Sequence, residues 1–467
     1  MTPATESALA PMRAAGLPDE EAREWADAFP AAPGEYESDA RRYGAFWRRS
    51  AALLRRLPPK PRRDEAEQAA AEALLTAARS SHESFLAAHV DEVYDRLTER
   101  RSKFRRLDDL VYDAAKLHPG LVPSREEVAA EAAHPQRDKD GVEIDQGLFL
   151  AYVLARPRIG EHLCHAMLLP RSESAPLVAE FAARGSIDLG PARLTRKGKA
   201  AHLDMINPRF LNAEDDTTLA ATEIAVDVAT LDRTTQIAVM RGAAVDNAKY
   251  PGRRIFGAGI NLTHLYLGKI PYLWFLIRDL GYVHKLLRGV AAPDSVPDDV
   301  NGRGVEKLWV AALDAFAIGG HCQAILCMDY VLAASDAFLT LPARKEGIIP
   351  GFANLRLPRF VGDRIARQAI FYDRKLECDS AEGRLICDEI APLAEMDAAV
   401  ERVVEGLTSA GAVSAIGNRR AIRVGQESLD LFRRYASVYA REQAYCHFSP
   451  ALIANLERHW DAKNRKI

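Results

Sequence analysis

Two short glycine-containing segments of the sequence have residue types and positions suited to forming two halves of one chemical site. They are Gly257-Ala258-Gly259-Ile260-Asn261 and Ala317-Ile318-Gly319-Gly320-His321-Cys322-Gln323. Glycine lets the backbone turn sharply and lets a ligand approach closely. The first N–H groups of a helix lack intrahelical partners and lie at the positive end of its dipole. Two such amides, converging from separate turns, would stabilise an oxyanion, such as the carbonyl oxygen of a thioester that is attacked or deprotonated.

The two turns need strands and helices to position them, and the surrounding sequence supplies both. Gln236 to Met240 and Leu308 to Leu313 are short aliphatic or β-branched runs bounded by polar or glycine residues, which predicts buried strands. Leu194 to Ile206 predicts a hairpin that turns near Lys197-Gly198-Lys199, and Leu219 to Leu231 predicts an amphipathic helix. This alternation of strands and helices indicates stacked parallel-strand units.

The two ends of the chain have helical patterns. Leu86, Val90, Val93 and Leu97 recur at the spacing of an amphipathic helix within an alanine-rich N-terminal region. Near the C-terminus, Ala399 to Gly406 and Ser428 to Ile453 also predict helices, and we expect Gly411 to Gly417 to form the break between them.

The composition predicts a globular protein without a nucleic-acid or membrane partner. Sixty-two basic residues against 65 acidic ones give a net charge of -3, which supplies no overall attraction for nucleic acid or an anionic membrane. No apolar run approaches the roughly 20 residues needed to cross a bilayer, and the N-terminus does not resemble a leader, so we expect a cytoplasmic protein. The six cysteines have no paired spacing, which favours reduced thiols.

Glu161-His162-Leu163-Cys164-His165 is the segment with most potential metal ligands. A closed zinc site needs more ligands than these, and no second cluster with zinc spacing occurs in the sequence. We therefore predict no metal site, and packing or surface histidines instead.

The residue pattern of the two turns resembles that of the crotonase (enoyl-CoA hydratase/isomerase) superfamily, in which an A-G-x-(D/N) turn and a G-G-x-C-(E/Q) turn each contribute an oxyanion amide. By this resemblance the two amides belong to Ile260 and Gly320. Ile206-Asn207-Pro208 with Asn212-Ala213 resembles the first CoA-contacting loop, and Gly347 to Gly351 resembles the I-P-G loop. The resemblance spans roughly Arg193 to Pro392. It implies an α/β fold with a ββα spiral core, preceded by an all-helical N-terminal domain and followed by C-terminal helices.

The sequence departs from the hydratases of this superfamily at both of their catalytic glutamates. The first position is Gln323 and the second is Ala343. An amide forms hydrogen bonds but does not exchange a proton near neutral pH, so the acid/base role is lost. We therefore do not expect hydration, although the oxyanion turns are retained.

A narrower resemblance fits these losses. The chain length, the helical N-terminal region, the R-R-I-F-G-A-G-I-N-L turn and the G-G-H-C-Q turn are similar to those of the cofactor-independent dioxygenase branch of the superfamily. This implies conversion of an arylacetyl-CoA and dioxygen to an arylglyoxylate and CoA, without metal, flavin or haem, in the biosynthesis of dihydroxyphenylglycine, an antibiotic precursor. A Cα–H between a thioester and an electron-rich ring is unusually acidic, and the resulting carbanion can itself reduce dioxygen.

The same resemblance assigns the remaining site residues. Glu214 and Arg278 are expected to make polar contacts with the ring hydroxyls or nearby parts of the substrate, and Gln323 to form hydrogen bonds beside the reacting centre. On the residues alone, Arg278 also fits a salt-bridged or snorkelling arginine, and Glu214 fits a carboxylate at a helix N-terminus. The candidates for the CoA phosphates, which pair with cations, are Arg209, Lys249, Arg253 and Arg254. His321 and Glu346 lie nearby in the sequence, but neither matches a catalytic position of the family, so no base is assigned.

Three divisions of the chain are expected: a helical domain over 1–190, an acyl-CoA-binding core over 191–395, and a helical region over 396–467. The resemblance implies that the last region acts in oligomerisation or as a lid, in a trimer or a dimer of trimers. Two alternatives remain open. One is a thioesterase, isomerase or decarboxylase that uses the same oxyanion turns, and the other is a non-catalytic acyl-CoA-binding protein.

Overall fold

The computed structural model describes residues 3–298 and 300–465, with only the backbone described for residues 3–8. The chain forms two compact units. Unit 1 contains Met1–Leu163, Leu267–Leu273 and Ser437–Ser449, and unit 2 contains Cys164–Tyr266, Trp274–Ala436 and Pro450–Ile467. Each unit is therefore assembled from segments that are far apart in the sequence.

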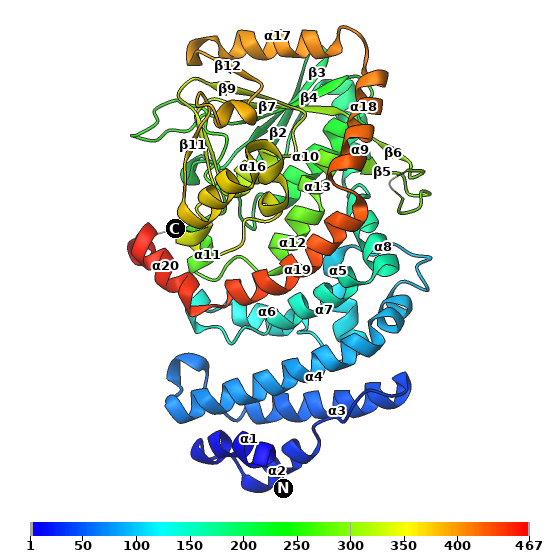
Figure 1. Ribbon diagram of the computed structural model, residues 1–467, viewed down its shortest axis with the longest axis vertical. Helices are drawn as coiled ribbons and strands as arrows, with labels where there is room; N and C mark the ends of the chain where they lie inside the picture. The colour runs from blue at the N-terminus through cyan, green and yellow to red at the C-terminus, as the bar shows by residue number, and fades with distance from the viewer. Residues whose placement is uncertain (1–2, 299, 466–467) are drawn as a thin grey trace. The chain divides into compact units, whose positions relative to one another are not determined.

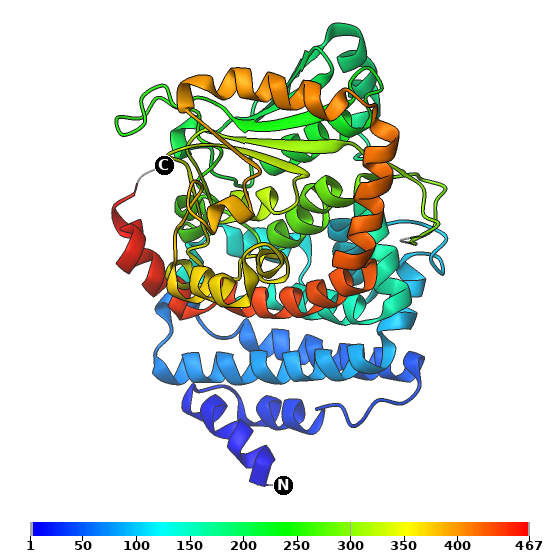
Figure 2. The same ribbon diagram turned by 45° about the horizontal axis from the view of Figure 1, so that its top comes forward.

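Unit 1 is helical. Its long helix α4 lies beside α3 (Figures 1 and 2) and buries Leu86, Val90 and Val93 of the stripe expected from the sequence, whereas Leu97 is half-buried. A capping box between Asp64 and Glu67 begins α4, since each residue's side chain satisfies a backbone N–H of the other. The helices are α1 (Pro3–Ala14), α2 (Asp19–Asp27), α3 (Tyr36–Leu54), α4 (Glu65–Leu97), α5 (Leu107–Leu117), α6 (Arg125–Ala132), α7 (Ile144–Ala155) and the first part of α8 (Pro157–Leu168).

The two later segments of unit 1 are held by buried polar contacts. The Tyr272 N–H donates to Glu143 Oε2 at 2.7 Å, and the Tyr272 hydroxyl donates to the Ala440 carbonyl at 2.5 Å. Gly147 allows α7 to approach this region closely, because a Cβ at Gly147 would lie 2.5 Å from Ala444 Cβ. These contacts join parts of the chain that are more than a hundred residues apart.

Unit 2 is built on a seven-stranded sheet with the order β1-β2-β3-β4-β7-β9-β12. Strands β1 to β3 pair antiparallel, whereas β3, β4, β7, β9 and β12 run parallel. The strands are β1 (Ser186–Asp188), β2 (Ala192–Lys197), β3 (Ala200–Met205), β4 (Ile237–Gly242), β7 (Leu308–Leu313), β9 (Tyr330–Ala334) and β12 (Glu389–Ala391). Strands β4, β7 and β9 are almost entirely buried, as expected for parallel strands covered on both faces.

A second, three-stranded sheet is made of β8 (Phe316–Ile318), β10 (Phe338–Thr340) and β11 (Leu376–Glu377). Strand β8 follows β7 and β10 follows β9, so each turn of the chain gives one strand to the large sheet and the next to the small one. This is the ββα spiral core expected from the sequence. A short hairpin of β5 (Val290–Ala291) and β6 (Gly304–Val305) completes the strands.

Helices cover both faces of the large sheet. Figures 1 and 2 show α10 and α13 on one face and α17 on the other. Lys285 in α13 is fully buried and donates to Glu223 Oε1 at 2.8 Å and to Asp227 Oδ1 at 2.7 Å, both in α10. The helices of unit 2 are the last part of α8, α9 (Ser174–Arg184), α10 (Leu219–Leu231), α11 (Leu262–Tyr266), α12 (Leu273–Leu280), α13 (Tyr282–Arg288), α14 (Gly320–Ile325), α15 (Ala343–Glu346), α16 (Ala353–Tyr372), α17 (Met396–Thr408), α18 (Ala412–Gln426), the first part of α19 (Leu429–His447) and α20 (Pro450–Trp460). The rest of α19, from Ser437, belongs to unit 1.

The structure confirms the expected fold class and most of the expected elements. The hairpin β2–β3 turns at Gly198, and α10 and β7 have the bounds predicted from the sequence. The break expected over Gly411 to Gly417 is wrong, because α18 begins at Ala412 and only the preceding turn is irregular. Gly411, at φ 78°, supplies the turn, whereas Gly417 is accommodated inside the helix.

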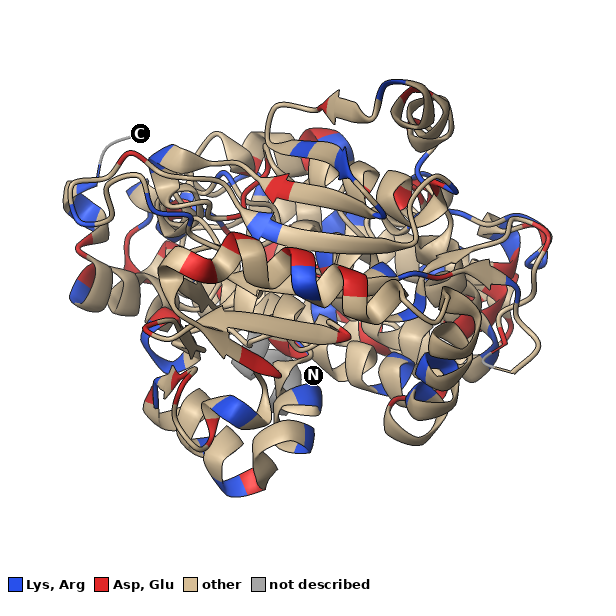
Figure 3. Cartoon of the chain, turned by 90° about the horizontal axis from the view of Figure 1, so that it is seen from above, with Lys and Arg blue, Asp and Glu red and all other residues tan. Residues whose placement is uncertain are grey.

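Charged residues of both signs are interspersed along the elements (Figure 3), in agreement with the small net charge. Among the described residues, no helix is both long enough and apolar enough to cross a membrane.

Candidate active site

The structure brings the two glycine turns side by side. Gly257 pairs with Ala317 as an isolated parallel bridge, with Gly257 N–H donating to the Phe316 carbonyl at 3.3 Å and Ile318 N–H donating to the Gly257 carbonyl at 3.0 Å. The first turn thus extends the edge of the small sheet at β8, which leads directly into the second turn.

A third segment, around Glu214, lies on the other side of the first turn. Glu214 and Ile260 form a second isolated parallel bridge. The Glu214 N–H donates to the Gly259 carbonyl at 2.8 Å, and the Asn261 N–H donates to the Glu214 carbonyl at 2.7 Å. The backbone therefore fixes Glu214 relative to both turns.

Two backbone amides at this junction are free. Among the described residues, neither the Ile260 N–H nor the Gly320 N–H donates a hydrogen bond. Gly320 is the first residue of α14, where an N–H has no partner inside the helix. Ile260 is 6% exposed, so its amide is largely withdrawn from solvent. These are the two amides that the sequence predicts for an oxyanion hole.

Glycine is required at two positions by the close approach of side chains. A Cβ at Gly257 would lie 2.2 Å from the His321 ring, and a Cβ at Gly320 would lie 2.5 Å from Glu214 Oε2 and 2.9 Å from Arg278 Nη2. The second distance also places the Glu214 carboxylate directly against the turn that carries the Gly320 amide.

Glu214 and Arg278 form a buried ion pair. Arg278 is 2% exposed, and its Nε donates to both Glu214 oxygens at 2.9 Å. The Arg278 Nη2 donates to the Gly320 carbonyl at 2.5 Å. Arg278 is therefore a salt-bridged arginine, which is one of the two roles that fit its sequence context. Glu214 is not at the N-terminus of a helix, because it lies in the extended bridge beside Ile260.

Three further side chains complete this cluster. Arg278 Nη1 donates to Gln323 Oε1 at 2.9 Å and to Asp279 Oδ1 at 2.5 Å. The Tyr282 hydroxyl donates to Glu214 Oε1 in a short hydrogen bond. We call Glu214, Arg278, Asp279, Tyr282 and Gln323 the polar cluster. Its guanidinium is used by four acceptors, so its position is tightly fixed.

The electrostatics keep this cluster charged. Burial is the largest single influence on the pKa of Glu214 and would raise it, but the Arg278 guanidinium and the other partners of this carboxylate together hold that pKa below its usual range. Burial likewise opposes the charge of Arg278, but Glu214, Tyr282 and Asp279 together raise the pKa of the guanidinium well above its ordinary value. Burial raises the pKa of Tyr282 well above its normal value, so its hydroxyl stays a donor.

His321 supports the first turn. Its Nδ1 accepts a hydrogen bond from the Gly259 N–H at 3.1 Å, so the neutral ring carries its proton on Nε2. Burial lowers the pKa of His321 to about 4. The ring is therefore neutral, and its only free lone pair is already used by the backbone.

The structure does not bring the predicted CoA-phosphate cations to the turns as one group. Arg209 and Lys249 are exposed. Arg253 pairs with Asp336, and Arg254 donates to Asp204 Oδ1 at 2.9 Å. The latter two side chains are thus partly neutralised.

The side chain of Asn261 has a structural role. Its Oδ1 accepts from the N–H groups of Thr263 and His264, which caps α11, and its Nδ2 donates to Asp215 Oδ2 at 2.9 Å. Only the backbone of Asn261 is available at the turn. Ala258 and Gly259 likewise contribute backbone to the turn, with Gly259 at φ 79°.

One group of side chains in the described residues has the proximity of metal ligands: Asp215, Asp216 and His264. Asp215 already accepts from Asn207, Asn261 and Thr217, and His264 Nδ1 contacts Asp216 at 2.9 Å. The donors around Asp215 make this group a support for the first turn, and we assign no metal to it. His162, in the histidine-containing segment Glu161 to His165, contacts the Tyr94 hydroxyl and the Arg101 carbonyl.

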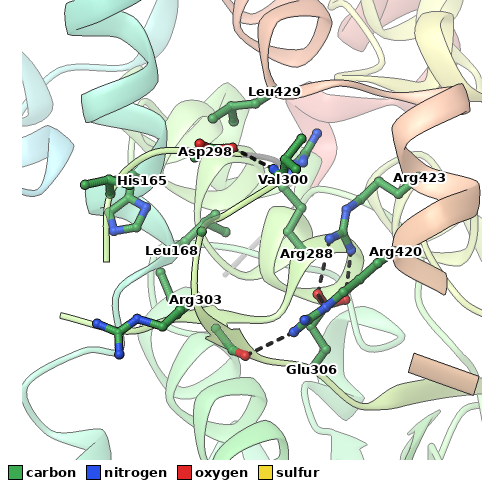
Figure 4. Close-up of a pocket in the computed structure, with 14 residues that line it drawn as sticks. His165, Leu168, Arg288, Asp298, Val300, Arg303, Glu306, Arg420, Arg423 and Leu429 are labelled. Atoms are coloured by element: carbon green, nitrogen blue, oxygen red, sulfur yellow. Dashed lines mark hydrogen bonds and ion pairs between the residues drawn. The ribbon is translucent and has the colours of Figure 1, made fainter. Parts of the chain in front are cut away.

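A separate pocket lies beside the β5–β6 hairpin (Figure 4). Arg420 and Arg423 reach into it from α18 and pair with Glu306 at 2.7 and 2.8 Å, and Arg288 donates to the Glu427 carbonyl. The charges of this pocket are therefore satisfied within the chain. None of its lining residues belongs to the glycine turns or the polar cluster.

Sequence reasoning missed Tyr282 and Asp279. A signal was present, because Arg278 and Tyr282 are four residues apart and Arg278 and Asp279 are adjacent charges in an otherwise apolar run. Glu214, the partner of Arg278 and Tyr282, is more than sixty residues away, so the cluster itself is visible only in the fold.

Several known proteins are similar to this chain. Residues 302–421 match the enoyl-CoA hydratase/isomerase family. A crotonyl-CoA hydratase of Syntrophomonas wolfei subsp. wolfei is 25% identical over 237 residues, which is 50% of this chain and 82% of that protein. Among solved structures, an enoyl-CoA hydratase/isomerase from Xanthobacter autotrophicus Py2 superposes with a TM-score of 0.48 at 21% identity, covering 59% of this chain and 96% of that one.

A protein built from these two turns on a ββα spiral is a member of the acyl-CoA enzymes of the crotonase superfamily. The (3,5-dihydroxyphenyl)acetyl-CoA 1,2-dioxygenase of Amycolatopsis orientalis is 44% identical over 393 residues, which cover 84% of this chain and 89% of that enzyme. The chain belongs to the enoyl-CoA hydratase/isomerase family, in the branch that contains this dioxygenase. The resemblance inferred from the two turns is thereby confirmed.

Proposed function

We propose that this chain is a dioxygenase that converts (3,5-dihydroxyphenyl)acetyl-CoA and dioxygen to 3,5-dihydroxyphenylglyoxylate and CoA, without a metal or redox cofactor. The relative of 44% identity carries this substrate and reaction class in its name. The observation that carries the proposal is the packing of the polar cluster against Gly320, since Glu214 Oε2 would lie 2.5 Å from a Cβ at that residue. A hydroxylated ring bound by the cluster would place its thioester at the free amides.

The polar cluster has unused capacity that fits two ring hydroxyls. Glu214 Oε1 accepts from Tyr282 and Arg278, but Oε2 accepts only from Arg278 among the described residues. We assign one ring hydroxyl to Oε2. Gln323 Nε2 donates to no described residue, because its Oε1 makes the contact with Arg278, and we assign it to the second hydroxyl. Tyr282 is itself a phenol on Glu214, so this carboxylate already binds the functional group of the proposed substrate.

The chemistry follows from the two amides. Loss of a Cα proton moves charge onto the thioester oxygen, where the N–H groups of Ile260 and Gly320 stabilise the enolate. The electron-rich carbanion transfers electrons to dioxygen and combines with it to give a Cα-peroxide. The peroxide attacks the thioester carbonyl and expels CoA, and cleavage of the O–O bond with loss of the second Cα proton gives the keto acid. Both oxygen atoms of dioxygen enter the product.

The remaining assignments are proposals that rest on the family relationship. We assign the acyl-CoA-binding core to residues 191–395, the N-terminal helical domain to 1–190, and the oligomerisation or lid region to 396–467. We propose a homotrimer or a dimer of trimers, a hexamer, in the cytoplasm. Arg209 and Lys249 are the better CoA-phosphate candidates, because Arg253 and Arg254 already pair with carboxylates.

The proposal is tested with oxygen uptake, CoA release and keto-acid formation measured together. Chelator-treated, colourless protein is given (3,5-dihydroxyphenyl)acetyl-CoA in air-saturated buffer. We expect all three quantities to be equal. CoA release without oxygen uptake would identify a thioesterase that uses the same turns, isomerisation without CoA release would identify an isomerase, and binding without turnover would identify an acyl-CoA-binding protein.

A further inference from the structure

Enolate formation needs a base, and the groups already described at the turns are unsuited to that role. The lone pair of His321 Nδ1 accepts from the Gly259 amide. Glu214 is held as a weakly basic carboxylate by Arg278 and Tyr282. Gln323 does not exchange protons near neutral pH. The proton acceptor must therefore be another group that reaches the junction of the two turns.

Glu346 is such a group. It is the last residue of α15, and it is 5% exposed although it carries a carboxyl. Its Oε1 lies 4.0 Å from the position that a Cβ at Gly319 would occupy, and the same position lies 3.6 Å from Gly259 Cα. Gly319 precedes Gly320, and Gly259 precedes Ile260. The Glu346 carboxyl is thus next to the point where the two amide-bearing turns meet.

We propose that Glu346 is the catalytic base that removes the Cα proton of the bound thioester. The proposal rests on the proposed function, since it names the base for that reaction. Among the described residues, the Glu346 carboxyl makes no hydrogen bond or ion pair, so both oxygens are free to accept a proton. A buried carboxyl without a partner is costly to maintain, and a proton-transfer role accounts for its retention.

The surroundings of Glu346 suit this role. Burial, assisted by the negative charge of Asp373, raises the pKa of Glu346 to about 8. Asp373 is itself paired with Arg344 and lies 3.8 Å from Lys345. A general base is most effective when its pKa is near the operating pH, since it is then both available and strong enough.

The proton balance of the reaction requires this base twice. In the first step the Cα–H bond breaks, the proton passes to Glu346 and the electron pair enters the enolate. The protonated carboxyl then returns that proton to the CoA thiolate as the thioester bond breaks. In the last step Glu346 accepts the second Cα proton while the O–O bond cleaves to the keto and carboxylate groups. This proton is finally released to solvent, so the enzyme is regenerated.

The test separates deprotonation from oxygenation. Wild-type protein is incubated with (3,5-dihydroxyphenyl)acetyl-CoA in D2O without oxygen, and loss of the Cα proton signal is followed by NMR. We expect Glu346→Gln to slow this exchange by about 10²- to 10⁴-fold, while the Kd of the thioester changes little and the thermal midpoint does not fall. The matched control is Glu401→Gln, at an exposed position of α17, which should exchange at the wild-type rate.

Glu346→Asp keeps the charge but shortens the side chain, so it tests the proposal even where the Gln variant folds poorly. We expect more than tenfold slower exchange with unchanged thioester binding. Exchange at the wild-type rate in either variant would overturn the assignment. Wild-type exchange without any oxygen uptake in air would reject the dioxygenase function and leave the base standing, and absence of exchange in the wild-type protein would reject both.

Discussion

The role of the Gly320 amide is tested by comparing two substitutions that differ in one N–H. A Cβ at residue 320 would lie 2.5 Å from Glu214 Oε2 and 2.9 Å from Arg278 Nη2, which is about 1 Å shorter than a normal contact. Gly320→Ala therefore displaces this ion pair but keeps the amide. Gly320→Pro introduces the same Cβ and also removes the N–H.

The expected magnitudes follow from these two effects. A displacement of about 1 Å of positioning groups costs on the order of 10²-fold in rate, which we expect for Gly320→Ala. Loss of one oxyanion donor costs a further 10²- to 10³-fold or so, which we expect for Gly320→Pro relative to Gly320→Ala. Proline is tolerated at the first position of a helix, which Gly320 occupies in α14, so the backbone accepts the ring.

The assay is the oxygen-free exchange of the Cα protons, because it reports enolate formation alone. Thioester binding and the thermal midpoint are measured for both variants, so that a loss of folding is recognised. Equal exchange rates for the Ala and Pro variants, with both folded and binding, would show that the Gly320 N–H does not stabilise the enolate and would refute the assigned oxyanion hole.

Three further predictions concern buried charges. Arg278→Lys replaces a guanidinium that donates to four groups by a single ammonium. We therefore expect kcat/KM to fall by about 10- to 100-fold for the dihydroxylated thioester and by less for phenylacetyl-CoA. An equal loss for both substrates would contradict ring recognition by the polar cluster. Lys285→Met removes the buried ammonium group that pairs with both Glu223 and Asp227, so urea unfolding should show a loss of about 3–5 kcal/mol, and an unchanged midpoint would contradict this. The pKa of Glu346 is about 8 in the folded protein against an ordinary 4.5, so the unfolded chain releases this proton at lower pH than the folded one. The free energy of unfolding should therefore fall as pH rises from about 4.5 to 8. Urea titrations should show a steeper fall with pH in the wild-type protein than in Glu346→Gln, and equal pH dependence in the two proteins would contradict this prediction.

Much of the fold was predictable because its signals are local. The run Leu308 to Leu313 became β7, Leu219 to Leu231 became α10, and the glycine at 198 turned the hairpin between β2 and β3. The error at Gly411 to Gly417 has a local cause as well. Glycine favours a helix break at both positions, but only Gly411 takes a positive φ, and Gly417 follows the helix.

The site was predictable where it is made of backbone and not where it is made of distant side chains. The two turns are recognisable from their glycine spacing. Glycine is required at two of these positions because the His321 ring lies beside Gly257 and the Glu214 carboxylate lies beside Gly320. The contact of Tyr282 depends on α13 meeting the Glu214 segment, whereas Asp279 joins the cluster through its neighbour Arg278. Glu346 lies near both turns because Gly319 and Gly259 meet beside its carboxyl, and no local sequence pattern predicts this long-range contact.

The central claim, that the enolate reacts directly with dioxygen and that both oxygen atoms remain in the product, is tested most directly by isotope labelling. Chelator-treated protein is given (3,5-dihydroxyphenyl)acetyl-CoA under ¹⁸O2, the keto acid is reduced with borohydride at once to prevent exchange with water, and its mass is measured. We predict two ¹⁸O atoms in each molecule, one from the keto group and one from the carboxylate. A product with one or no ¹⁸O atom would contradict the account, because water would then have released the CoA.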